Sequence, residues 1–103
     1  MTKKELERIV RSLEGYKIIL TKEEYRKEGR KNFSKNPLET TTREITVEEY
    51  DNIFSSIDFF KSLGGNERIY KSYTVAGYIP TKLVSTSPDK EIKIIRKISI
   101  GRY

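Results

Sequence analysis

The chain has 103 residues and a formal net charge of +6, with 21 Lys and Arg residues against 15 Asp and Glu residues. Hydrophobic residues make up 35% and charged residues another 35%, which predicts a single domain, residues 1–103, with a small core and a strongly ionic surface. The sequence contains neither Cys nor His, which excludes disulfides, thiolate zinc sites and nucleophiles activated by histidine. No stretch has the length of a signal-peptide core or a membrane span, so we expect a cytoplasmic protein without a membrane partner.

The charge is unevenly distributed along the chain. Residues 1–51 carry 12 cations and 11 carboxylates, whereas residues 52–103 carry 9 and 4. A basic C-terminal half indicates an anionic partner, which is either nucleic acid or an acidic protein surface. Charge that only keeps a small protein in solution explains the same numbers.

The first segment, residues 1–29, is predicted to contain a helix, a strand and a second, short helix. Thr2 and Glu5 have the spacing of a capping box, and Gly15 marks the end of the first helix. Between them lies an apolar seam at helical spacing, formed by Leu6, Ile9, Val10 and Leu13. We expect this seam to pack inside the domain, although a dimer seam or a partner-binding helix has the same pattern.

After this helix, the run YKIIL at residues 16–20 is typical of a β-strand. Thr21 and Glu24 then form another capping box. This box predicts a short helix that ends by Gly29, although no apolar stripe comes after it.

Residues 30–41 are predicted to form a basic loop, because residues that favour turns are frequent there. Cations surround one aromatic side chain in and just before this loop, and we take them as candidates for contact with a partner or with nucleic acid: Arg26, Lys27, Arg30, Lys31, Phe33 and Lys35. Such a mixture can follow a phosphate backbone and stack a base. A solvated linker has the same composition.

The last segment, residues 42–103, is predicted to contain a strand, a central helix and an antiparallel meander. Thr46 and Glu49 form a capping box for the helix, and Gly64 stands where a C-terminal cap is expected. One apolar stripe of this helix consists of Tyr50, Ile53, Phe54, Ile57 and Phe60, whereas Phe59 and Leu63 lie towards another side. A helix that is apolar on two sides is expected between two layers.

Three runs, at residues 68–75, 78–86 and 91–100, predict the strands of the meander, with turns at Ala76-Gly77 and at residues 87–90. Pro80 cannot donate a ladder hydrogen bond, so the second strand should be interrupted or edge-like there. The predicted fold class is therefore α+β, with an antiparallel meander packed on the central helix and an additional amphipathic helix at the N-terminus.

Alternation within the second and third of these strands predicts which side chains share a face of the sheet. In the first strand, at residues 68–75, alternation is ambiguous and assigns Tyr70 and Tyr73 to neither face. The face towards the central helix should carry Ile79, Leu83, Ile92, Ile94, Ile98 and Ile100. The opposite face should carry the contact candidates Tyr78, Lys82, Lys93 and Lys97. Tyrosines and lysines on an open sheet face are typical of single-stranded RNA platforms, and they are also ordinary residues on the solvated side of a sheet.

The one enzyme class that this composition leaves open is a ribonuclease that uses Lys, Arg and Tyr. The stretch YKIILTKEEYRKE resembles the first strand and helix of the ribosome-dependent mRNA-cleaving toxins of bacterial toxin–antitoxin pairs. The stretch EIKIIRKISIGRY is similar to their last strand and basic-aromatic tail. That resemblance implies Arg96, Arg102 and Tyr103 as the positions to test. Otherwise we expect no enzymatic activity, no metal and no cofactor.

A second resemblance covers residues 42–96. The stretch TREITVEEYDNIFSSIDFFKSLGG, together with YTVAGYIPTKLVSTSPDKEIKIIR, is similar to small proteins carried by bacteriophages and mobile elements of Gram-positive bacteria. It implies an accessory protein that binds a host protein or ribonucleoprotein, in the manner of anti-CRISPR and other counter-defence inhibitors. A direct RNA- or DNA-binding domain and the toxin-like ribonuclease remain the alternatives.

Overall fold

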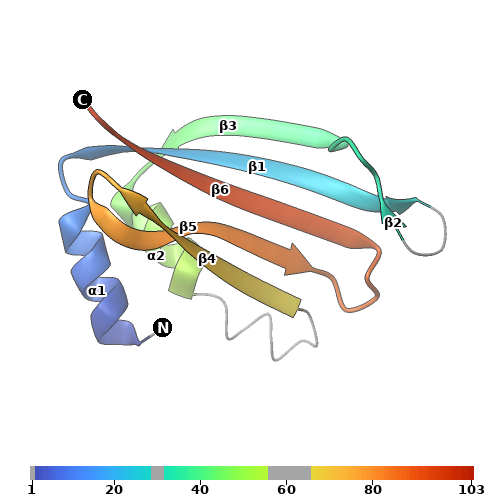
Figure 1. Ribbon diagram of the computed structural model, residues 1–103, viewed down its shortest axis with the longest axis horizontal. Coiled ribbons are helices and arrows are strands. Elements are labelled where there is room, and N and C mark those ends of the chain that lie inside the picture. Colours follow the sequence, from blue (N-terminus) through green and yellow to red (C-terminus); the bar gives the residue numbers. More distant parts are fainter. Residues whose placement is uncertain (1, 29–31, 56–65) are drawn as a thin grey trace.

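The computed structural model describes residues 2–28, 32–55 and 66–103, and each helix in this part of the chain is followed by three strands (Figure 1). They are α1 (Lys3–Ser12), β1 (Tyr16–Glu28), β2 (Asn32–Phe33), β3 (Glu39–Ile45), α2 (Val47–Ser55), β4 (Asn66–Thr74), β5 (Gly77–Thr86) and β6 (Ile92–Arg102). All the strand pairs among these described elements are antiparallel. The predicted α+β class with an antiparallel sheet is therefore confirmed.

Helix α1 begins and ends where the sequence predicts. The Glu5 backbone N–H donates to Thr2 Oγ1 at 3.2 Å, which satisfies one of the free N–H groups of the first turn. Gly15 has a φ of +88°, a backbone conformation that glycine adopts without steric cost. This turn directs the chain from the end of α1 into β1.

The predicted short helix after Thr21 is wrong, because β1 continues as a strand to Glu28. A helix there would have no apolar stripe to bury, whereas the strand pairs with β3 on one side and β6 on the other. The Thr21 hydroxyl lies 3.4 Å from the Thr42 hydroxyl on β3 and caps no helix. This change also removes the strand-then-helix order on which the likeness to mRNA-cleaving toxins depends.

The predicted basic loop at residues 30–41 is also wrong in part. Asn32 and Phe33 form β2, which pairs with the end of β1, and β3 already begins at Glu39. Because β1 extends to Glu28, its backbone is available to pair with both β2 and β3, so these residues form strands and not a solvated linker. Residues Arg30 and Lys31 lie outside the described part of the chain.

Helix α2 starts at the predicted cap, where the Glu49 N–H donates to Thr46 Oγ1 at 3.2 Å. Tyr50 and Phe54 are buried, and their ring centroids lie 4.8 Å apart. The described helix ends at Ser55. The predicted continuation of the apolar stripe and the cap at Gly64 lie outside the described residues.

The meander is confirmed, and β4, β5 and β6 follow one another as neighbours in the sheet. The predicted irregularity at Pro80 is present, because the β4–β5 register shifts between Tyr70 and Lys71 and β5 pairs with β6 only from Lys82 onwards. The turn before β6 closes with a hydrogen bond of 2.9 Å from the Lys90 N–H to the Ser87 carbonyl.

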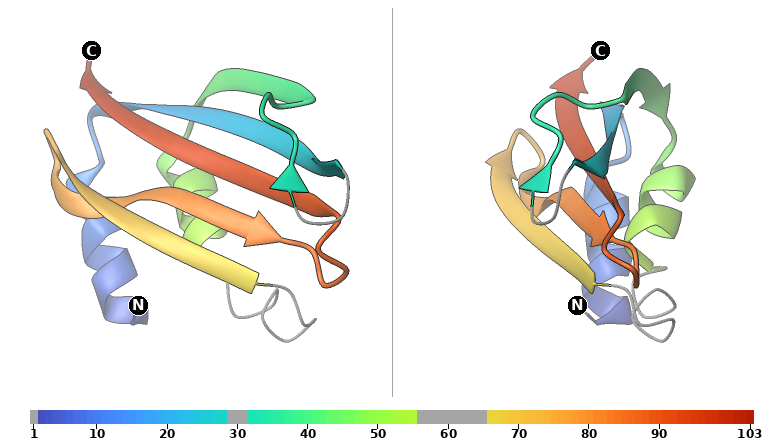
Figure 2. Two further views of the ribbon diagram at one scale, coloured as in Figure 1. Left: turned by 45° about the vertical axis from the view of Figure 1, so that its right-hand side comes forward. Right: turned by 90° about the vertical axis from the view of Figure 1, so that its right-hand side faces the viewer.

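The sheet has the order β2-β1-β6-β5-β4, and β3 also pairs with β1. Figure 2 shows α1 and α2 on the same side of the twisted sheet. One buried cluster joins both helices to this face of the sheet, and it consists of Leu6, Ile9, Leu13, Ile18, Leu20, Ile45, Tyr50, Phe54, Ile79, Leu83 and Ile98. Neither described helix covers the other face.

Candidate interaction surface: the open face of the sheet

The sheet face opposite the helices, which we call the open face, combines cations with aromatic rings. Opposed residues of antiparallel strands share a face, and the register places Lys82 opposite Lys97 and Tyr25 opposite Lys93. The same register assigns to this face the cations Lys17, Lys27, Arg68, Lys82, Lys93 and Lys97, the aromatic residues Tyr25, Phe33, Tyr70, Tyr73 and Tyr78, and the carboxylates Glu23 and Glu44. Cations therefore outnumber carboxylates here, within the described strands.

Lys93 lies between two aromatic rings from neighbouring strands. Its ammonium nitrogen is 5.1 Å from the ring centroid of Tyr25 on β1 and 4.8 Å from that of Phe33 on β2. Each contact has cation–π geometry and stabilises the position of the ammonium group by about 0.5–1 kcal/mol at an exposed site. The three strands thus present a cation and two rings together at one end of the open face.

The middle of the open face is organised by Glu23. Lys97 Nζ lies 2.7 Å from one carboxylate oxygen, and the Tyr25 hydroxyl donates to the other at 2.8 Å. The hydrogen bonds from Lys97 and then from Tyr25 lower the pKa of the Glu23 carboxyl. The hydrogen bond to Glu23 raises the pKa of Lys97 and that of Tyr25. The carboxylate therefore stays ionised at neutral pH and holds Lys97 in position.

A second group of cation and rings lies towards the β4–β5 turn. Lys82 Nζ is 5.4 Å from the ring centroid of Tyr70, and the rings of Tyr73 and Tyr78 contact each other at an interplanar angle of 37°, with centroids 4.7 Å apart. Tyr73 is 87% exposed and Tyr78 is 55% exposed. These rings have accessible surface to offer to a partner.

The structure brings most of the predicted contact residues together on the open face: Lys27, Phe33, Tyr78, Lys82, Lys93 and Lys97. Arg26 does not join them, because alternation along β1 places it on the helix side, opposite Ile92. Lys35 is exposed in the connection between β2 and β3. Arg30 and Lys31 lie outside the described residues.

Sequence reasoning missed Glu23 and Tyr25, and it left the face of Tyr70 and Tyr73 open. Alternation back from Lys27 would have found Tyr25 and Glu23, had β1 been recognised as one long strand. Tyr70 and Tyr73 are three residues apart, so simple alternation assigns them to opposite faces. The register shift after Tyr70 changes the parity and places both on the open face.

The positions implied by the likeness to toxins do not gather at one site. Arg96 and Arg102 are six residues apart on β6, a separation of about 20 Å along a strand. The Tyr103 hydroxyl donates to Glu44 at 2.8 Å, and this hydrogen bond raises the tyrosine pKa. Arg96 therefore lies apart from Arg102 and Tyr103.

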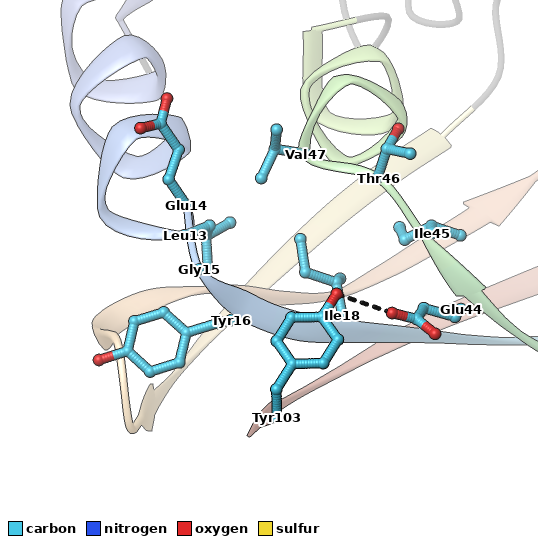
Figure 3. Close-up of a pocket in the computed structure, with 10 residues that line it drawn as sticks. All are labelled: Leu13, Glu14, Gly15, Tyr16, Ile18, Glu44, Ile45, Thr46, Val47 and Tyr103. Carbon is cyan, nitrogen blue, oxygen red and sulfur yellow. Dashed lines mark hydrogen bonds between the residues drawn. The ribbon is translucent and has the colours of Figure 1, made fainter.

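A cavity of about 540 Å³ lies on the helix side, between the end of α1 and the start of α2 (Figure 3). Its floor is largely aliphatic, and the hydrogen-bonded pair Glu44–Tyr103 stands at one rim. The residues that line it are Leu13, Glu14, Gly15, Tyr16, Ile18, Glu44, Ile45, Thr46, Val47 and Tyr103. In the part of the chain that the structure describes, no group of carboxylates is placed to hold a metal ion.

None of the described helices has the length and apolar character needed to cross a membrane. Comparison of the chain with protein-family models, with curated proteins and with solved structures gave no match.

Proposed function

We propose that this chain is a non-catalytic binding protein that contacts single-stranded nucleic acid through the open face. The observation that supports this proposal most strongly is the placement of Lys93 between Tyr25 and Phe33. Single-stranded nucleic acid is bound by surfaces that offer cations to the phosphates and aromatic rings to the bases. The second group, Lys82 with Tyr70, repeats this combination further along the sheet.

The helix side of the sheet suits such a ligand less well. Its polar residues beyond the core carry mixed charges: Lys22, Glu24, Arg26, Glu39 and Arg96.

The proposal also includes the architecture expected from the sequence, in which the helix that begins at Val47 packs against the sheet on the side opposite the open face. The hydrogen bond of 2.7 Å from the Tyr50 hydroxyl to the Pro80 carbonyl supports this arrangement. No cofactor is needed.

The test is fluorescence anisotropy with labelled single-stranded RNA and DNA oligonucleotides of mixed sequence at several salt concentrations. We expect binding that weakens steeply with salt, because each phosphate contact releases counterions. Lys93→Gln should weaken binding and reduce the slope of log K against log[salt] by about 0.7. Lys4→Gln, the same change on the exposed surface of α1, is the matched control and should leave both unchanged.

A ring variant separates stacking from charge. Phe33→Leu should lower the affinity by about 1–3 kcal/mol with no change in the salt slope. Binding that is absent, that does not depend on salt, or that responds equally to Lys4→Gln and Lys93→Gln would rule out nucleic-acid binding through the open face.

The second candidate function is binding of a host protein or ribonucleoprotein, such as inhibition of a CRISPR effector by a phage protein in the bacterial cytoplasm. The exposed pair Tyr73–Tyr78 favours it, because tyrosine is enriched in the centre of protein interfaces. Its test is a pull-down from a nuclease-treated bacterial lysate. A protein retained by the natural chain and lost with Tyr73→Ser and Tyr78→Ser would support this candidate, and recovery of no protein would count against it.

A further inference from the structure

The free edge of β3 is a second surface that can bind a partner. β3 pairs with β1 on one side, and no other described strand lies beside it. Its residues from Glu39 to Glu44 are all exposed. An exposed, extended edge presents unpaired N–H and C=O groups and is a template for another strand.

The hydrogen bonds around β1 show which backbone groups of β3 point outwards. The Lys27 N–H donates to the carbonyl of Glu91, the residue just before β6. Odd-numbered residues of β1 therefore direct their backbone groups towards β6. Even-numbered residues of β1 face β3, and the carbonyls of Arg26 and Glu24 accept hydrogen bonds from that side. The register then sets the direction on β3 itself.

Leu20 pairs with Arg43, and Lys22 pairs with Thr41. The backbone groups of Arg43 and Thr41 therefore face β1. Those of the intervening residues, Thr40, Thr42 and Glu44, face the free edge. A second strand would be held by these outward groups without any change in the ladder to β1.

The other edge of the sheet is protected, and β3 is not. β4 carries a register shift between Tyr70 and Lys71, and irregularities of this kind block edge-to-edge pairing. The described part of β3 pairs with β1 residue by residue from Glu39 to Ile45, with no proline, lysine or shift. This edge carries three exposed charges, Glu39, Arg43 and Glu44, but no bulge or proline that would interrupt pairing.

We infer that β3 pairs antiparallel with β3 of a second copy of this chain, about a twofold axis through Thr41. Within its own chain Arg43 pairs with Glu49 at 2.7 Å. In the proposed register Glu39 of each copy lies opposite Arg43 of the other, so each arginine would lie between Glu49 of its own chain and Glu39 of the second copy. The outward backbone groups of Thr40 then meet those of Thr42. Within one chain Glu39 lies opposite Glu24, which places two negative charges side by side. Arg43 of the second copy would offset this repulsion.

The pairing would join two sheets into one. A twofold axis perpendicular to the sheet keeps equivalent faces on the same side, so the open faces of the two copies become continuous. This inference does not depend on the ligand of the open face, because the edge and the face use different groups.

Sedimentation equilibrium over a wide concentration range tests the inference. We expect a reversible dimer for the natural chain. Thr42→Pro removes an outward N–H from each copy and should weaken the dimer about tenfold or more, whereas Thr42→Val keeps the N–H and should dimerise normally. Both variants lose the contact with the Thr21 hydroxyl, so this loss is matched. Circular dichroism is the check that both variants fold, and it should give the spectrum of the natural chain for each.

The register is tested by charge exchange. Glu39→Lys and Arg43→Glu should each weaken the homodimer, and a mixture of the two should form the heterodimer in preference, as measured by native mass spectrometry. Three outcomes would each overturn the inference. The first is a natural chain that is monomeric at every concentration, and the second is a dimer unaffected by Thr42→Pro. The third is that the single charge variants dimerise as the natural chain does and form no preferred heterodimer.

Discussion

At the scale of single residues, Tyr50 joins helix and sheet through its ring and through its hydroxyl. The side chain is fully buried, and its hydroxyl donates to the Pro80 carbonyl at 2.7 Å. Pro80 lies in the part of β5 that does not pair with β6 and where the pairing with β4 is irregular. Fewer backbone groups of neighbouring strands are therefore available to hydrogen-bond its carbonyl. Burial raises the pKa of Tyr50 well above its ordinary value, and the hydroxyl stays a donor throughout the physiological range.

Tyr50→Phe should therefore destabilise the protein by about 1–2 kcal/mol, because the Pro80 carbonyl loses a buried donor while the ring is retained. Urea unfolding at equilibrium measures the change. Tyr73→Phe removes a hydroxyl from a ring that is 87% exposed and should alter the free energy of unfolding by less than about 0.5 kcal/mol. Equal effects of the two variants would contradict the role given to Tyr50.

A second single residue, Glu23, makes the free energy of unfolding depend on pH. Its pKa in the folded protein lies below the ordinary 4.5, first because of the hydrogen bond from Lys97 and then because of that from Tyr25. The ionised pair therefore contributes stability above pH 4.5, and this contribution is lost as the pH falls through the folded-state pKa. The loss should be about 1 kcal/mol or less, because Lys97 is half exposed.

The corresponding measurement compares urea unfolding of the natural chain and of Glu23→Gln from about pH 6 to about pH 3. The difference in unfolding free energy should shrink as the pH falls. Glutamine retains an acceptor for Tyr25 but has no titrating group. A difference that stays constant across this range would show that Glu23 does not titrate with a lowered pKa.

At the scale of elements, one local motif has two different outcomes. The Thr-x-x-Glu pattern at Thr2 and Thr46 caps a helix, and the same pattern at Thr21 lies inside a strand. The outcome depends on the residues that come after the motif. An apolar stripe comes after Thr2 and Thr46, whereas the residues after Thr21 have no helical face to bury.

Thr46→Ala should cost about 1 kcal/mol, because the Glu49 N–H loses its acceptor. Thr21→Val should change stability by less than about 0.5 kcal/mol, since valine suits a strand and the hydroxyl contact at 3.4 Å is long. Chemical denaturation of both variants provides the check. A cost at Thr21 as large as that at Thr46 would mean that Thr21 acts as a cap.

At the scale of the whole molecule, a single core connects the first helix to the last strand. Leu13 is completely buried at the end of α1 and belongs to the same cluster as Ile98 of β6. α1 therefore depends on the sheet for most of its stability, because a ten-residue helix is marginal by itself.

Leu13→Ala should destabilise the protein by about 2–5 kcal/mol. Helix and sheet should unfold together, so that transitions followed by far-ultraviolet circular dichroism and by tyrosine fluorescence coincide. Val75→Ala, at a side chain that is 50% exposed, is the control and should cost less than about 0.5 kcal/mol. Separate transitions for the two probes would contradict one cooperative core.

Local pattern was enough to predict the α+β class, the caps at Thr2 and Thr46, and the three strands of the meander. It was also enough to place Tyr78, Lys82, Lys93 and Lys97 on one face, because alternation in a regular strand needs no knowledge of its neighbours. These features depend on residues close together in the chain. They could therefore be inferred without coordinates.

Pairing between distant segments had to be seen in three dimensions. β1 is long because β3 and β6 lie beside it, and Arg26 faces the helix side because that strand continues through it. Phe33 reaches Lys93 from a distant part of the sequence, and Tyr70 joins Tyr73 only through a register shift. Contacts of this kind join residues that are far apart in the sequence. A local pattern of residues does not say which distant segment will lie beside it, so these contacts could be seen only in the folded chain.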